Sequence, residues 1–329
     1  MTLINTMKII TLEEHFTTPM YVQGVSHASL GGSGGANNHM QAIIRKEADL
    51  ADERIADMDA AGIDLQVLSL SGILLDTLDP ATATAVAHDA NNILAQSVRA
   101  NPDRFASFAA LGLKEPKVAA DELKRCVNEL GFKGAVVNGT TNGLFLDDPL
   151  FYPVFEAAQE LDVPIYLHPA PPTSAVREAY YSGLPEGYGQ ALSIAGWGWH
   201  AEGGLHVLRL IVSGLFDRLP RLQVIIGHMG ENLPFSIARA DSVLAHAGSL
   251  GKPVIEYFRT NFHITTSGYF TLPPFLCALM VMGADRLMFS VDYPFSTNIQ
   301  GRAFLDSLPV STEDKEKIAH GNAERLLKL

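Results

Sequence analysis

Residues 8–16 read KIITLEEHF, a β-branched apolar run that passes directly into ionisable side chains. Residues 9–12 predict a short buried strand, and Glu13, Glu14 and His15 follow at its carboxyl end. A solubilising turn needs fewer charges than this. A metal site or an acid–base site needs carboxylate and imidazole groups side by side, so the stretch indicates chemistry at the end of a strand.

Similar apolar runs recur along the chain. Seven more predict strands at 65–71, 104–111, 133–139, 163–169, 222–228, 261–267 and 286–294. Their apolar residues are continuous and do not alternate with polar ones, which is typical of strands covered on both faces. Amphipathic patterns between them predict helices at 48–61, 81–100, 116–130, 149–161, 202–216, 272–282 and 312–327.

This alternation predicts an α/β fold, a (β/α)8 TIM barrel that forms a single domain over residues 1–329. The alternative, a doubly wound open sheet, requires a glycine-rich phosphate loop after the first strand, and TLEEHFTTP is not one. The chain is longer than a minimal barrel, so insertions are expected at Tyr21–Met40 and Pro169–Trp199. Both follow strands, where active-site loops lie, and the glycine-rich residues 30–38 predict a mobile lid.

Composition excludes several classes of partner. The 329 residues carry a formal net charge of −12, which disfavours nucleic acid and anionic membranes. The two cysteines, Cys126 and Cys277, indicate free thiols in a reducing compartment. With no signal peptide and no membrane-spanning segment, the sequence predicts a cytoplasmic protein. The charged fraction of only 18% is weakly consistent with a homo-oligomer.

Polar residues gather at the predicted strand ends, which converge on one mouth of a barrel. They are Glu13, Glu14, His15, Asn138, His168, His228 with Glu231 after it, and Asp292. Residues i and i+2 share a face of a strand, so Glu13 and His15 are expected to point into the barrel and Glu14 away from it. Imidazole and carboxylate together suit Zn²⁺, Mn²⁺ or Fe²⁺.

Each of these residues also has an ordinary structural explanation. A lone strand-end histidine such as His168 is more often a hydrogen-bonded core residue, His228 suits a helix cap, and Asp292 suits a turn before proline. Such accidents would have to recur at the same end of four different strands. The combination therefore favours a metal site.

The sequence resembles the amidohydrolase superfamily. Within it, the sequence is most similar to the branch with aminocarboxymuconate-semialdehyde decarboxylase and the hydroxybenzoate decarboxylases such as γ-resorcylate decarboxylase. The stretches that carry the resemblance run nearly end to end: LEEHF, DMDAAGIDLQVLSL, GFKGAVVNG, LDVPIYLHP, WGWHAEGGLHVLRLI, IIGHMGENLPFSIARAD and LMFSVDYPF. The resemblance implies a homodimer or homotetramer.

The resemblance also implies residue roles. The implied metal ligands are Glu13, His15, His168 and Asp292. Asp292 doubles as the catalytic acid/base, and His228, oriented by Glu231, lies near the reacting group. Arg239 and Asn138 are the implied substrate contacts, and the apolar Phe16 is a candidate wall of the pocket along with Tyr188, Trp197 and Trp199.

Two departures from the superfamily pattern bear on the reaction. Lys133 lies at the start of its predicted strand, so the superfamily's carboxylated lysine is absent and one metal ion, Zn²⁺ or Mn²⁺, is expected. Glu13 stands where many relatives have histidine, and its added negative charge makes a bound metal a weaker Lewis acid. That suits binding a substrate anion better than ionising water.

The leading prediction is non-oxidative decarboxylation of an ortho-hydroxylated aromatic acid, such as 2,6- or 2,3-dihydroxybenzoate. The alternative is a metal-dependent hydrolase or hydratase that acts on a carboxylate-bearing lactone, ester or dicarboxylate, with Asp292 deprotonating a metal-bound water. A third hypothesis is a relative that binds a ligand without catalysis. Either enzyme would act on a small aromatic or unsaturated carboxylic acid.

Overall fold

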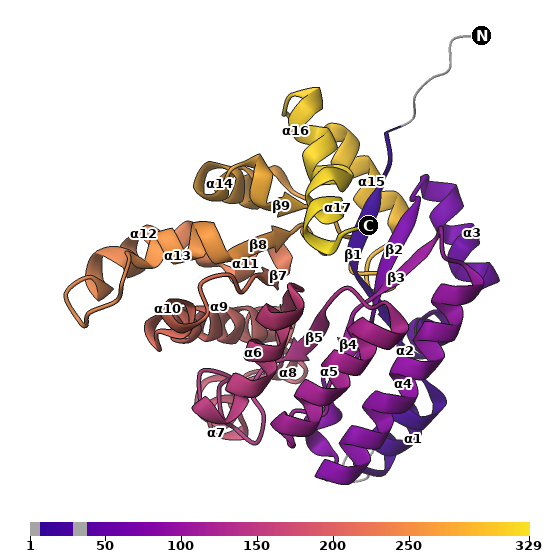
Figure 1. The fold of residues 1–329 in the computed structure, drawn as a ribbon, viewed down its shortest axis with the longest axis horizontal. Helices are drawn as coiled ribbons and strands as arrows, with labels where there is room; N and C mark the ends of the chain where they lie inside the picture. The colour runs from indigo at the N-terminus through magenta and orange to yellow at the C-terminus, as the bar shows by residue number, and fades with distance from the viewer. Residues whose placement is uncertain (1–6, 29–37) are drawn as a thin grey trace.

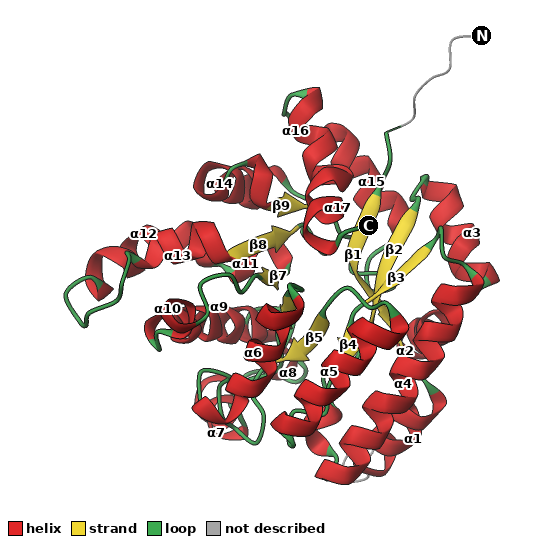
Figure 2. Ribbon diagram, in the orientation of Figure 1, coloured by secondary structure: helices red, strands yellow, loops and turns green. Residues whose placement is uncertain are grey.

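The computed structural model describes residues 7–28 and 38–329. Its strands lie at the centre with helices packed outside them (Figures 1 and 2). The strands are β1 (Ile10–Phe16), β2 (Leu65–Leu70), β3 (Phe105–Ser107), β4 (Ala109–Ala110), β5 (Ala135–Asn138), β6 (Ile165–His168), β7 (Val224–Ile226), β8 (Phe262–Thr265) and β9 (Leu287–Met288). All paired strands are parallel.

β3 and β4 are two halves of one barrel strand. They flank Phe108, whose backbone N–H donates to Leu68 O in β2 at 2.9 Å, while Ala109 N donates to Gly134 O beside β5 at 2.9 Å. The strand therefore changes hydrogen-bonding partner at Phe108. Counted this way, the eight predicted strands are all present.

The ring closes between the first strand and the last. β1–β3 and β4–β9 form two hydrogen-bonded sets, joined through the β3–β4 strand. On the other side, His15 N donates to Tyr293 O at 2.7 Å, and Glu14 pairs in parallel with Tyr293. The predicted (β/α)8 barrel is therefore confirmed.

The helices surround this ring. They are α1 (Pro19–Ala28), α2 (Asn38–Ala48), α3 (Asp52–Ala61), α4 (Pro80–Ala100), α5 (Pro116–Leu130), α6 (Tyr152–Leu161), α7 (Ser174–Tyr181), α8 (Tyr188–Ser193), α9 (Gly198–Val212), α10 (Leu215–Arg218), α11 (His228–Glu231), α12 (Leu233–Leu244), α13 (Val254–Asn261), α14 (Leu272–Met282), α15 (Asn298–Ser307), α16 (Thr312–Glu316) and α17 (Asn322–Leu327). Across the described ranges, no helix combines the length and the apolar character that crossing a membrane requires.

Several predicted helix bounds need correction. The helix expected at 48–61 begins at Asp52, as α3, because Ala48 ends α2 and the Asp49 carboxylate accepts from Ala51 N and Glu53 N in the turn between them. The predicted insertions also contain helices, with α1 and α2 in the first and α7 and α8 in the second. The predicted lid at 30–38 lies, except for its last residue, outside the described residues.

Two apolar layers hold the barrel. The larger fills the space between strands and helices, and the smaller lies inside the ring. The inner layer comprises Ile10, Leu12, Leu65, Val67, Ala106, Phe108, Val136, Tyr166, Ile225 and Met288, closed below by Ala323 and Leu327 of α17. The interior of the barrel is therefore apolar toward the amino ends of the strands. Polar groups lie beyond this layer at both ends of the barrel.

Candidate metal centre

A β-bulge in β1 aims the site's first two residues. Ile10 pairs with Leu65 and His15 with Ser69, but the register shifts between Thr11 and Glu14. Two residues of β1 thus oppose one of β2, which reverses the inside–outside phase of the strand above that point. Leu12 below the shift and Glu13 above it therefore both face inward, one into the apolar layer and one into the site.

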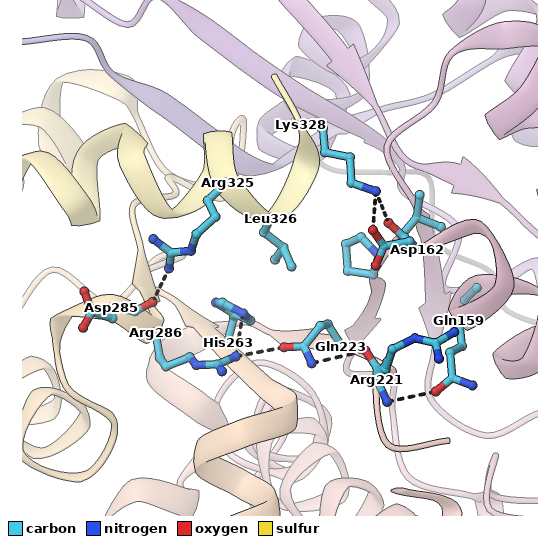
Figure 3. A pocket seen from close by; sticks show the side chains of 13 residues that line it. Gln159, Asp162, Arg221, Gln223, His263, Asp285, Arg286, Arg325, Leu326 and Lys328 are labelled. Atoms are coloured by element: carbon cyan, nitrogen blue, oxygen red, sulfur yellow. Dashed lines mark hydrogen bonds and ion pairs between the residues drawn. The ribbon is translucent and has the colours of Figure 1, made fainter. Parts of the chain in front are cut away.

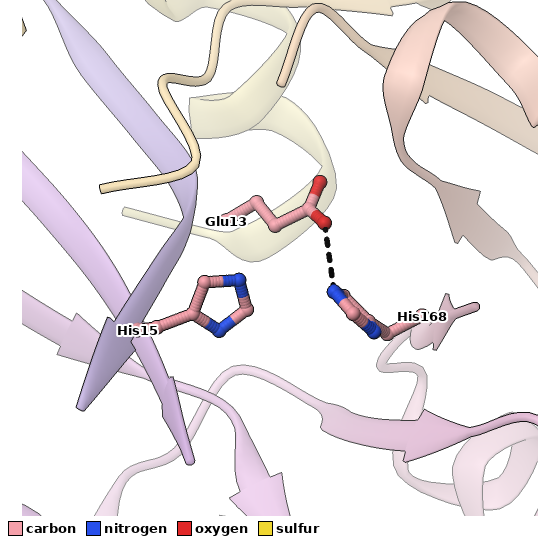
Figure 4. Close-up of side chains that lie close together, drawn as sticks. All are labelled: Glu13, His15 and His168. Atoms are coloured by element: carbon pink, nitrogen blue, oxygen red, sulfur yellow. Dashed lines mark ion pairs between the residues drawn. The ribbon is translucent and has the colours of Figure 1, made fainter. Parts of the chain in front are cut away.

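Five side chains from four strand ends meet above the apolar layer, and we call them the buried cluster: Glu13, His15, His168, His228 and Asp292. Glu13 Oε1 lies 3.3 Å from His168 Nε2 and 3.6 Å from His228 Nε2. His15 Nε2 lies 3.1 Å from Asp292 Oδ1. Figure 4 shows Glu13 and His15 from β1 facing His168 from β6 across the barrel.

The charges of the cluster depend on one another. Burial alone would raise the pKa of Glu13, but His228, His168 and His15 outweigh it and lower that pKa to about 2. Burial likewise opposes charge on His228, yet Glu13 and Glu231 raise its pKa to about 10. At neutral pH this arrangement holds an ionised carboxylate against an imidazolium.

His168 remains neutral in this setting. Burial lowers its pKa to about 4, despite the opposing effect of Glu13. Its Nδ1 lies 2.7 Å from Pro169 O and donates to that carbonyl, which directs Nε2 toward the cluster. A neutral imidazole with its free nitrogen turned inward is the form that ligates a metal.

Asp292 lies in the loop that follows β9. Its backbone is left-handed, with φ of 70°, and its carbonyl accepts from Ser296 N at 3.0 Å. Burial raises the pKa of its carboxyl group, His15 opposes the rise, and Glu13 adds to it. The two carboxyl groups of the cluster are thus held differently, with Glu13 biased toward the ionised form and Asp292 toward the protonated form.

A chain of side chains supports His228 from behind. Glu231 Oε1 accepts from His228 Nδ1 at 2.6 Å, and Glu231 Oε2 accepts from His200 Nδ1 at 2.7 Å. His228, Met229 and Glu231 all have positive φ in the irregular turn α11. Left-handed backbone at non-glycine residues costs free energy and is concentrated at functional sites.

Glu14 has the structural position predicted for it, outside the ring. Its carboxylate accepts from Val291 N at 2.9 Å, from Tyr293 N at 3.1 Å and from Ser290 Oγ at 3.2 Å. Burial raises its pKa to about 7. The buried Arg54 donates to His15 O at 2.6 Å from the same side, so both residues fix the upper end of β1.

The residues expected to contact a substrate are spread more widely. Asn138 pairs in register with His168, next to the cluster. Arg239 lies exposed on α12, and within the described chain it makes no ion pair. Phe16 lies above the bulge on the outward face and packs in the layer between strands and helices. Alternation along β1 places Phe16 on the face opposite His15, and its contact with a substrate stays a prediction.

Aromatic rings flank the cluster. Phe295 lies edge-on to His15 with centroids 5.6 Å apart, and Trp199 approaches His168 at 6.3 Å. Tyr269 lies 6.0 Å from His228. The sequence analysis named three loop aromatics as walls of the pocket. Trp199 lies beside the cluster, whereas Tyr188 and Trp197 are exposed. Phe295 was not selected from the sequence, although its position shortly after Asp292 could have indicated that it lies near the site.

Three residues that the sequence analysis did not select support the cluster. Tyr166 OH donates to Glu13 Oε2 and lies 2.9 Å from Thr265 Oγ1. His200, on α9, reaches Glu231 from another part of the chain. Tyr166 is two residues before His168 on one strand, so the i, i+2 rule could have identified it. His200 lies in a helix, and sequence periodicity carries no signal of its contact.

The unpaired atoms of the cluster fit a cation. Glu13 Oε1 and His15 Nδ1 are buried without a hydrogen-bond partner in the described structure. Leaving such groups unsatisfied is costly unless something else binds them. Potential ligand atoms of Glu13, His15 and His168 lie within 4.8 Å of one another, and so do those of Glu13, His228 and Asp292. The donor set suits one divalent ion.

Comparison with known proteins places this geometry in context. A family model described as amidohydrolase matches residues 36–329. Gamma-resorcylate decarboxylase of Polaromonas sp. (strain JS666) is 37% identical over 97% of this chain and 98% of the relative. The match therefore includes both barrel ends and the whole buried cluster.

Solved structures give the same result. The crystal structure of 2,6-dihydroxybenzoate decarboxylase complexed with 2,6-dihydroxybenzoate is similar at a TM-score of 0.88 and 37% identity, covering 98% of each chain. The dihydroxybenzoic acid decarboxylase from Polaromonas sp. JS666, with bound manganese and 2-nitroresorcinol, also has a TM-score of 0.88 and 37% identity, and it covers 98% of this chain and 97% of its own.

Proposed function

The chain belongs to the amidohydrolase family, and from this membership we propose that it is a metal-dependent, non-oxidative decarboxylase of an ortho-hydroxylated aromatic acid. The 2,6- and 2,3-dihydroxybenzoates are its candidate substrates. The observation that carries the proposal is the meeting of two buried carboxyl groups, Glu13 and Asp292, with three histidines at the strand ends of one barrel. The similarity to decarboxylases over nearly the whole chain supports it.

We assign one divalent ion, Mn²⁺ or Zn²⁺, to Glu13, His15, His168 and Asp292. The buried unpaired atoms of Glu13 and His15 support this assignment, and a manganese ion is present in a similar solved structure. When bound, such an ion supplies positive charge that attracts the carboxylate and phenolate oxygens of the substrate.

The protein's own groups then move one proton. Asp292 holds that proton because burial and Glu13 raise its pKa, and it delivers the proton to the ring carbon that bears the carboxylate. The bond from that carbon to the carboxylate carbon then breaks. Its electron pair returns to the ring and restores aromaticity, CO2 leaves, and Asp292 remains as a carboxylate.

His228 and Glu231 form the electrostatic part of the site. The imidazolium of His228 faces the cluster through Nε2, 3.9 Å from Asp292 Oδ2, while Glu231 holds Nδ1. A fixed positive charge here stabilises negative charge that develops on the substrate's phenolic oxygen. Glu231 keeps that charge in place by orienting the ring.

Two further residues are assigned to substrate binding. We assign the amide of Asn138 to a ring hydroxyl, because Asn138 is in register with His168 on the neighbouring strand. Arg239 is exposed on α12, beside exposed apolar residues of α12 and α14, namely Phe235, Val243, Leu272, Leu276 and Met280. An exposed apolar surface of this kind favours association, so we assign Arg239 to a site completed in a homodimer or homotetramer.

We also infer one domain over residues 1–329 and a cytoplasmic location. Closure of the ring by the first and last strands supports a single domain. Two free cysteines, Cys126 and Cys277, support a reducing compartment.

A substrate panel tests the proposed function. The purified chain is loaded with Mn²⁺ or Zn²⁺ and incubated with 2,6-, 2,3- and 2,4-dihydroxybenzoate and with 2-hydroxybenzoate, and CO2 and the phenol are quantified. Metal-dependent CO2 release is expected, with none from 4-hydroxybenzoate, which lacks the ortho hydroxyl. Turnover of lactones or esters without any decarboxylation would favour the hydrolase or hydratase alternative and reject the proposal.

A further inference from the structure

A second polar site lies at the opposite end of the barrel. A cavity of about 390 Å³ opens where β6, β7, β8 and β9 begin, beside the C-terminal helix α17. We call it the basal cavity. Its charged and polar lining comprises Gln159, Asp162, Arg221, Gln223, His263, Asp285, Arg286, Arg325 and Lys328, which surround an open centre in Figure 3.

The charges of this lining do not balance. Two carboxylates face four cationic side chains, in a protein whose net charge is −12. Asp162 pairs with Lys328 at 2.5 Å, and Asp285 pairs at 3.2 Å with Lys317 outside the cavity. Within the described residues, Arg221, Arg286 and Arg325 make no ion pair. Three guanidinium groups thus face one cavity without a carboxylate partner.

Arg286 is the best-fixed of the three. Its side chain is partly buried. Its Nη1 donates both to Gln223 Oε1 at 2.8 Å and to His263 Nε2 at 2.9 Å. Burial lowers the pKa of Arg286, and Arg325 lowers it further. Asp285 acts against this lowering from a distance but forms no ion pair with Arg286, so the hydration that this half-buried cation loses is not replaced by a paired carboxylate.

His263 adds a neutral wall to the cavity. Burial, together with Arg286 and Arg325, lowers its pKa to about 3, so it is neutral at physiological pH. Because Arg286 donates to Nε2, the proton lies on Nδ1, and that atom is buried with no partner among the described residues. His263 therefore offers the cavity no free acceptor.

The shape and chemistry of the basal cavity select a class of ligand. Its volume falls in the range of small-molecule sites, and Ala158, Val163, Pro164 and Leu326 complete the wall. Guanidinium forks bind carboxylate and phosphate oxygens in pairs, and the excess of cationic side chains in the lining disfavours a metal cation. The apolar inner layer separates this cavity from the buried cluster.

We propose that the basal cavity binds a small oxyanion with two or more negative charges, held by Arg286, Arg325 and Arg221. The anion supplies the counter-charge that the chain does not. Inorganic phosphate and the phosphate group of a small metabolite share this chemistry. The site is independent of the decarboxylation site, because none of its residues belongs to the buried cluster.

Calorimetric titration of the metal-loaded protein with inorganic phosphate tests the proposal, at ionic strength held constant with NaCl. Saturable binding is expected. Arg286→Gln and Arg325→Gln should each weaken it about 10- to 100-fold, the range for losing a hydrogen bond to a charged group. The matched control is Arg99→Gln, which removes the same charge from an exposed position on α4 outside the cavity, and it should stay within about twofold of the parent protein.

The two variants also separate the basal cavity from phosphate held at the metal. Phosphate at the buried cluster would compete with a hydroxybenzoate and would survive both substitutions. Circular dichroism and metal content of each variant establish that it is folded. Absence of saturable binding overturns the proposal, and so does binding that both Arg286→Gln and Arg325→Gln retain. Phosphomonoester titrations then distinguish free phosphate from a phosphorylated metabolite as the better ligand.

Discussion

The two ends of the barrel carry charge in opposite ways. At the carboxyl ends of the strands, Glu13 Oε1 lies within 4 Å of Nε2 of both His168 and His228. All three side chains are almost fully buried. At the amino ends, Arg286 and Arg325 face a cavity with no carboxylate of their own. At the carboxyl ends, which we call the upper end, carboxylates and imidazoles lie close enough to interact. At the amino ends, which we call the lower end, positive side chains outnumber carboxylates.

This difference separates chemistry from ligand binding. Buried opposite charges shift one another's pKa values, which is what proton transfer requires. Like charges that line an open cavity instead attract an oppositely charged molecule. Substitutions at the upper end should therefore change turnover and metal binding, and substitutions at the lower end should change stability and anion binding.

The largest expected effect is at Asp292. Asp292→Asn keeps the size of the side chain but removes the proton that the proposed reaction delivers. We expect turnover of 2,6-dihydroxybenzoate to fall about 10²- to 10⁴-fold, the usual contribution of a positioned acid, with the metal retained. CO2 release and metal content by elemental analysis measure the two quantities. Normal turnover in this variant would remove Asp292 from the mechanism.

The adjacent residues Glu13 and Glu14 test whether the bulge separates a metal ligand from a structural residue. Glu13→Gln removes a charge that faces the cluster and should weaken metal binding by about 100-fold or more, since even indirect support of a ligand is worth 10- to 100-fold. The matched control, Glu14→Gln, makes the same change one residue along. It should leave metal affinity unchanged and cost about 1–3 kcal/mol of unfolding free energy, because Glu14 accepts backbone N–H bonds.

Metal affinity by competition with a chelator, and unfolding by denaturant, separate the two outcomes. If both variants lose metal equally, the bulge does not make Glu13 a ligand and Glu14 a structural residue. If Glu13→Gln binds metal normally, its assignment as a ligand is wrong.

The bulge also marks how far the sequence could predict the structure. Apolar runs and their polar ends predicted the eight strands and the meeting of His15, His168 and Asp292, because strand-end position in a barrel follows from the strand pattern alone. The i, i+2 rule placed Glu13 and His15 together. Applied to Leu12, the same rule gives the opposite face, yet Leu12 also faces inward, because the bulge depends on pairing with β2 and leaves no mark in the strand pattern.

What the sequence did not predict comes from long-range packing. His200 meets Glu231 because α9 packs on α11, and no local periodicity encodes that contact. Arg239 was predicted to contact the substrate, and its exposed position on α12 leaves that contact a prediction that depends on a second copy of the chain. The helices inside the Pro169–Trp199 insertion were missed because proline, glycine and aromatic residues dominate there. The basal cavity was missed because its arginines lie before strands β7 and β9 and on the C-terminal helix α17, where the sequence analysis sought no site.

Acid should weaken the lower end through His263. Its folded pKa of about 3 lies below the ordinary value near 6.5, so the unfolded chain binds more protons in between. The stability from neutral His263 is complete above about pH 6.5 and is lost as the pH falls toward 3. At pH 5 the loss is about 2 kcal/mol, so His263→Gln should reduce the fall in unfolding free energy between pH 7 and pH 5 by that amount.

Urea unfolding in phosphate-free buffer at several pH values measures this dependence. The exposed His246→Gln serves as the control, since it removes a histidine from outside the barrel. An unchanged pH dependence in His263→Gln would mean that the buried imidazole is already charged or hydrated in the folded protein.

The smallest expected effect is at the outer edge of the upper end. His200→Gln removes the second ring held by Glu231, so His228 loses orientation but keeps its charge partner. We expect kcat to fall about tenfold, the lower range for supporting residues, with KM and metal content nearly unchanged. A merely structural role would instead lower the unfolding free energy and leave the kcat of the folded fraction intact. Restored kcat in His200→Asn, whose amide nitrogen matches the position of Nδ1 whereas that of Gln lies one carbon further out, would identify the hydrogen bond to Glu231 as the cause.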